Sequence, residues 1–139
     1  MPGSEASADA TPGTPPAMDA RTRKFRQAAF VYLHVAILYE FVVFVLWRQD
    51  LLPSTRGPGA LWLVIGAGIT AVVFWGLWSW RNVWFARTIW VLHALRLPAL
   101  IAGAFFPQTG AVIPPGLWAM AIPIVLINLW MIARAAWDL

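Results

Sequence analysis

The stretch Val91–Leu100, VLHALRLPAL, places a histidine, an arginine and a proline within six positions of an apolar sequence. His93 and Arg96 are three residues apart, so they share one face of a helix. An imidazole can carry a proton or ligate a metal, whereas a guanidinium stays charged at any accessible pH. Pro98 has no N–H and leaves the carbonyl of Ala94 without its helical partner. The stretch therefore predicts a polar site within an apolar helix.

Three further polar residues stand alone in long apolar segments: His34, Glu40 and Asn128. The chain has no cysteine, which excludes disulfides, thiolate metal sites and thiol nucleophiles. It also has no glycine-rich phosphate loop and no plausibly spaced set of serine, histidine and acid. We therefore expect neither an enzyme nor a metal site. Whether the polar residues meet depends on the elements that carry them.

The composition predicts that these elements cross a membrane. Of the 139 residues 60% are hydrophobic and 12% are charged, whereas a soluble domain is roughly a quarter charged. A transmembrane helix needs about 20 apolar residues to cross about 30 Å of hydrocarbon. Four segments have this length, at 28–47, 60–80, 88–106 and 117–136. The sequence predicts an all-α integral membrane protein, a four-transmembrane-helix bundle over residues 25–139.

Residues 1–24 differ from the rest of the chain. The first twenty are mainly Pro, Gly, Ser, Thr and Ala with three acids, so they bury little apolar surface, and we expect a disordered tail. Basic residues precede the first predicted helix and flank the predicted turn between the second and third helices, as orientation signals do. This placement favours an inner, cytoplasmic membrane with both termini in the cytoplasm, and it argues against nucleic acid as a partner.

With this orientation the polar residues fall in the cytoplasmic half of the bundle. His34 and His93 lie about five or six residues deep and Arg96 about eight, at 1.5 Å per residue. We expect one intramembrane polar cluster, formed by His34, Glu40, His93, Arg96 and Asn128. A carboxylate near the midplane has to be protonated, paired or hydrated. A Glu40–Arg96 ion pair is the leading interpretation; a titrating Glu40, or an Arg96 that extends toward the headgroups, remains an alternative.

Two histidines at equal depth on two helices are also what a b-type haem requires as axial ligands. His34 and His93 would then face each other across the porphyrin, with Arg96 near a propionate. A haem-bearing electron carrier is therefore a second alternative function. The leading expectation is a protein that binds no cofactor.

The segment Tyr32–Phe41, YLHVAILYEF, resembles the first helix of the small multidrug resistance transporters. That family has four helices and a glutamate midway along the first, which exchanges protons for cationic drugs in a dimer. The resemblance implies that Glu40 is a coupling acid and Tyr32 a pocket wall. It covers ten residues, and the third helix departs from the family by carrying His93 and Arg96.

Small residues on the second predicted helix permit close helix approach, within the bundle or between protomers. They form two pairs, Gly66 with Thr70 and Ala67 with Ala71. The partners expected from the sequence are the lipid bilayer and a second copy or a larger membrane complex. The predicted function is that of a small, non-enzymatic accessory or assembly subunit or a standalone bundle, with a proton-coupled transporter as the alternative.

Overall fold

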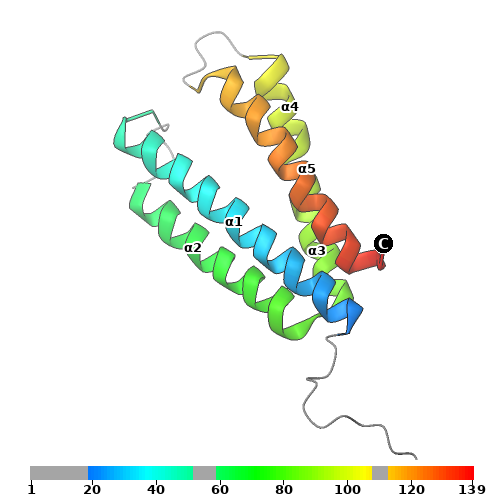
Figure 1. Ribbon diagram of the computed structural model, residues 1–139. Helices are drawn as coiled ribbons and strands as arrows, with labels where there is room; N and C mark the ends of the chain where they lie inside the picture. The colour runs from blue at the N-terminus through cyan, green and yellow to red at the C-terminus, as the bar shows by residue number, and fades with distance from the viewer. Residues whose placement is uncertain (1–18, 52–58, 108–112) are drawn as a thin grey trace, which may run out of the picture.

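A computed structural model of the chain describes residues 19–51, 59–107 and 113–139. The helices are α1 (Ala20–Arg48), α2 (Gly59–Trp75), the π-helical turn η2 (Gly76–Trp80), α3 (Val83–Ala94), α4 (Leu97–Phe105) and α5 (Pro115–Trp137). They form four segments long and apolar enough to span a membrane, because α2 continues into η2 and α4 follows α3. The predicted all-α fold with four transmembrane-length helices packed together is confirmed (Figure 1).

The first helix is longer than predicted. It begins at Ala20 rather than near residue 28, so residues 20–24 belong to the helix and not to the predicted tail. Asp19 caps it, since its side chain accepts a hydrogen bond from the Thr22 amide at 3.4 Å. Arginine and lysine are good helix formers, which lets the basic segment continue the apolar helix toward its N-terminus. Residues 1–18 of the predicted tail lie outside the described residues.

The third span also differs from the prediction, because it starts at Val83 rather than residue 88 and consists of two helices. Asn82 sets the start, accepting hydrogen bonds from the amides of Trp84 and Phe85 at 2.8 and 3.3 Å. The helical assignment stops after Ala94 and resumes at Leu97. Pro98 explains the interruption, since its ring cannot donate to the Ala94 carbonyl and clashes with it.

The buried core lies at one end of the bundle, which we call the terminal end because α1 starts and α5 finishes there (Figure 1). Five of its eleven residues are alanines, and α1, α2, η2, α3 and α5 all contribute. The core consists of Phe25, Ala28, Ala29, Tyr32, Val73, Leu77, Ala86, Ile89, Ile132, Ala135 and Ala136. Because lipid tails are as apolar as these side chains, the close approach that alanines permit is what holds such helices together.

Polar contacts close the terminal end. The Lys24 ammonium lies 2.7 Å from the Asp138 carboxylate, and Arg81 donates a hydrogen bond of 3.0 Å to the Thr22 hydroxyl. The hydrogen bond from Lys24, and then its charge, lower the pKa of the Asp138 carboxyl. The Arg87 guanidinium lies over the Trp84 and Trp137 rings, 5.0 and 5.5 Å from their centroids. Exposed ion pairs contribute little to stability, so these contacts mainly fix how the helix ends meet.

The opposite end, which we call the loop end, is much less tightly packed. α2 packs on α1, and α5 packs on α1, α3 and α4, but in the described parts no substantial packing joins α2 to α4. No residue of α4 is buried. Figure 1 shows α1 and α2 diverging from α4 and α5 toward the loop end. The α1–α2 pair and the α4–α5 pair are therefore farther apart at the loop end than at the terminal end (Figure 1).

Two glycines of the second span provide a matched test of the packing. A Cβ at Gly76 would clash with the Phe85 ring, whereas one at Gly68 would meet open space. We expect Gly76→Ala to cost about 1–3 kcal/mol by overpacking. The control Gly68→Ala should be neutral or stabilising by up to about 1 kcal/mol, because alanine favours a helix. Thermal unfolding in detergent measures both, and equal melting temperatures would contradict the packing of η2 on α3.

Candidate functional site

Two of the predicted polar residues are in the interior of the bundle. His93 of α3 is buried, and its ring meets the Tyr32 ring of α1 edge to face, with centroids 5.3 Å apart. Its Nδ1 lies 3.0 Å from the Ile89 carbonyl oxygen. Because a carbonyl can only accept, Nδ1 carries the proton and Nε2 is left as the acceptor of the neutral ring.

Asn128 of α5 is completely buried, and among the described residues neither its amide nitrogen nor its amide oxygen has a hydrogen-bond partner. Leaving a buried polar group unsatisfied costs about 1–3 kcal/mol. Its neighbour Leu129 is a buried apolar residue of the same helix. Asn128 is thus a polar group held in the interior at an energetic cost, whereas its depth along the sequence predicted only that it would join a polar cluster.

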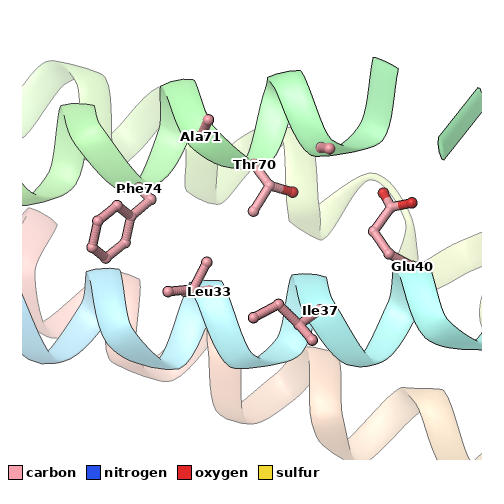
Figure 2. A pocket seen from close by; sticks show the side chains of 7 residues that line it. Leu33, Ile37, Glu40, Thr70, Ala71 and Phe74 are labelled. Carbon is pink, nitrogen blue, oxygen red and sulfur yellow. The ribbon is translucent and has the colours of Figure 1, made fainter. Parts of the chain in front are cut away.

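Arg96 and Glu40 do not form the expected ion pair. Arg96 is exposed at the break between α3 and α4, and its guanidinium carbon lies 5.9 Å from the centre of the Tyr39 ring. The Glu40 side chain instead extends toward α2, where it occupies the space left by the missing side chain of Gly66 (Figure 2). Successive residues of a helix point about 100° apart, so Tyr39 faces Arg96 and Glu40 faces α2.

Glu40 lies at one end of an open groove between α1 and α2 (Figure 2). The groove has a volume of about 440 Å³. It is lined by Leu33, Ile37, Glu40, Ala67, Thr70, Ala71 and Phe74. Gly66, Ala67, Thr70 and Ala71, the predicted small residues, therefore face α1 around this groove. Glu40 supplies the only ionisable group of this otherwise mostly apolar lining.

The two histidines do not face each other. His34 is exposed, and its Nδ1 lies 2.7 Å from the Phe30 carbonyl oxygen of its own helix. Tyr32 is the residue of α1 that meets His93, and His34 is two positions further, about 200° around the helix. One chain therefore does not fit axial ligation of a haem by this pair. Rather than forming one cluster, the predicted residues are spread over the core, the α1–α2 groove, the helix break and the exposed surface of α1.

The sequence reading missed Tyr39, the ring that Arg96 contacts. Spacing along the chain carries no signal for this contact, because it joins two helices whose relative rotation is set by packing. The resemblance to the small multidrug resistance transporters implied only that Tyr32 is a pocket wall. In the structure the Tyr32 ring packs on His93. No protein-family model matches the chain, and no curated protein or solved structure is detectably similar to it.

The unsatisfied amide of Asn128 gives a direct test of the interior. We expect Asn128→Leu to raise the unfolding free energy by about 1–3 kcal/mol, because it removes a buried polar group that gains no hydrogen bond. The control is Asn82→Ala, which should cost about 1 kcal/mol by removing the α3 cap. Thermal unfolding in the same detergent compares them. A destabilised Asn128→Leu variant would mean that the amide has a partner, such as a bound water.

Proposed function

We propose that this chain is a non-enzymatic assembly subunit of an inner, cytoplasmic membrane, whose charged mid-span residues meet charged groups of a partner's transmembrane helices. The observation that carries this proposal is the exposed Arg96 in the middle of the third span. Among the described residues neither Arg96 nor Glu40 has an ion-pair partner, although both lie well inside membrane-spanning segments.

The energies indicate that compensation within the chain is incomplete. Even the lenient insertion scale assigns about 2.5–3.5 kcal/mol to an arginine at the centre of a span. A cation over an aromatic ring returns about 0.5–2 kcal/mol, and Tyr39 is at the far limit of that contact. The remaining cost favours a carboxylate or a phosphate from outside the chain. The polar side chains of the spans also point in different directions and do not converge on one site. This supports a binding role over catalysis.

The distribution of basic residues supports an orientation with both termini in the cytoplasm. Four basic residues start α1, and Arg81, Arg87 and Arg134 lie at the same terminal end. Short cytoplasmic segments of membrane proteins carry such an excess. We expect a reporter active only outside the cytoplasm to stay silent when fused after Leu139, and to be active when inserted between α1 and α2. The reverse pattern would contradict this orientation.

A proton-coupled carrier is the second candidate, and the groove between α1 and α2 favours it. Glu40 is an acid in a mostly apolar groove of about 440 Å³, within the size range of small-ligand sites. In this role Glu40 would bind either a proton or an apolar cation. Arg96 contacts Tyr39 on another side of α1, so its charge does not neutralise the acid.

One experiment separates the two candidates. A photoreactive amino acid at Leu95, which is 69% exposed beside Arg96, should form protein adducts in native membranes. Assembly predicts that Arg96→Gln lowers the adduct yield about tenfold or more while the fold persists, because the charge loses its partner. The control Arg48→Gln, at the exposed end of α1, should leave the yield unchanged.

A chain that cross-links only to lipid would contradict the assembly role. The carrier candidate instead predicts proton-gradient-driven uptake by purified protein in liposomes. Glu40→Gln would abolish this uptake and leave the Leu95 adducts intact.

A further inference from the structure

We infer that the partner is a second copy of this chain, with Arg96 of each copy lying against Glu40 of the other across a two-fold axis along the membrane normal. This inference rests on the proposed assembly function and specifies its partner. Three observations carry it: the nearly equal depth of the two charges, the absence of an ion-pair partner for either charge among the described residues, and the access that an exposed Arg96 and the open groove around Glu40 give to another chain.

The two charges lie at one level of the bundle. Arg96 contacts the Tyr39 ring, and Glu40 follows Tyr39 on α1 with a rise of about 1.5 Å. Rotation about an axis along the membrane normal leaves depth unchanged. Each Arg96 in such a dimer is therefore automatically at the level of the partner's Glu40.

The two charges also face different sides of α1. Glu40 extends to the α2 side of α1, as Figure 2 shows, and Arg96 is at the start of α4. Tyr39, which is 59% exposed, separates them on α1. One protomer thus presents a negative group beside α2 and a positive group at the break between α3 and α4.

A two-fold axis makes this arrangement self-complementary. In an interface of this symmetry, where residue i of one copy contacts residue j of the other, j of the first also contacts i of the second. Two copies that place Arg96 of one against the α1–α2 groove of the other then bring each acid opposite an arginine, and both charges of each copy are compensated at once. A single chain at this separation of its helices compensates neither.

Both charges have room for such contacts. Arg96 is exposed, and the groove that holds Glu40 is open. The exposed Gly68, which has open space around it, allows another helix to approach α2 closely. Two charge pairs at the membrane centre also give specificity, since a dimer shifted along the membrane normal would leave the charges unpaired.

Charge exchange between two chains tests the inference. Glu40→Lys and Arg96→Glu chains carry different affinity tags and are expressed alone or together in one membrane. Each variant alone brings like charges together, so its two tags should co-purify at least about tenfold less than those of the wild type. Mixing the variants pairs the introduced lysine with the introduced glutamate, and the native Arg96 of one chain with the native Glu40 of the other. Both pairs then have opposite charges, so the two tags should co-purify again. Arg48→Gln serves as the unaffected control.

The outcomes separate the possible arrangements. Rescue only when both substitutions are in one chain, Glu40→Lys with Arg96→Glu, and not by mixing the single variants, would mean that residues 40 and 96 pair within one protomer and would overturn the inference. Wild-type chains whose tags never co-purify, but whose Leu95 adducts depend on Arg96, would replace the second copy by another membrane protein and leave the assembly function standing. Absence of both signals would contradict both proposals.

Variants that fail to fold would be recognised by their melting curves. The milder pair Glu40→Gln and Arg96→Gln then provides the measurement. Each should lower tag exchange, and unchanged exchange in both folded variants would overturn the inference.

Discussion

Close packing of alanines at the terminal end is the interaction on which the rest of this structure depends. Ala28 and Ala29 of α1, Ala86 of α3 and Ala135 and Ala136 of α5 are almost fully buried there. Within a bilayer no hydrophobic driving force separates helix from lipid, so helices associate where small side chains let their backbones approach. The bundle is therefore fastened at one end, and its helices diverge toward the loop end (Figure 1).

The break in the third span places Arg96 outside the packed terminal end. The membrane requires every backbone polar group to be satisfied, and Pro98 removes one partner in the middle of a span. The chain responds with a turn at Leu95–Arg96, where the amides of Leu95 and Arg96 donate to Val91 and His93. The turn carries the charged side chain out of the packed end. An arginine that would be hard to accommodate in the alanine-rich core thus lies where the helices diverge.

A tightly packed terminal end and a looser loop end are in keeping with the assembly role that we propose. Rigid packing around Phe25 and Ile132 fixes the relative positions of α1 and α5. Glu40 and Arg96 lie away from this core at nearly one depth, on different sides of α1. An unpaired charge in a low-dielectric medium is costly and an oppositely charged partner offsets that cost, so the same residues that destabilise an isolated chain can define its partner.

The sequence by itself determined the class of protein. Four continuous apolar segments near 20 residues long do not favour water, and a helix satisfies the backbone of such a segment within itself in lipid, so the all-α spans followed from composition and length. The loss of the helical hydrogen bond at Ala94 was also readable from Pro98, although the division of the third span into two helices was not predicted, and the interior positions of His93 and Asn128 could be counted along the chain. Helix starts at Ala20 and Val83 were missed, because single cap residues extended helices past the apolar segments.

Only the tertiary structure decided which side chains meet. Depth can be counted along a helix, but rotation about its axis depends on which small residues pack at the other end. That rotation turned Glu40 toward Gly66 and Tyr39 toward Arg96, and it separated His34 from His93. A rotation of one residue, about 100°, is enough to exchange an ion pair for a cation–aromatic contact, and no spacing within a single helix encodes it.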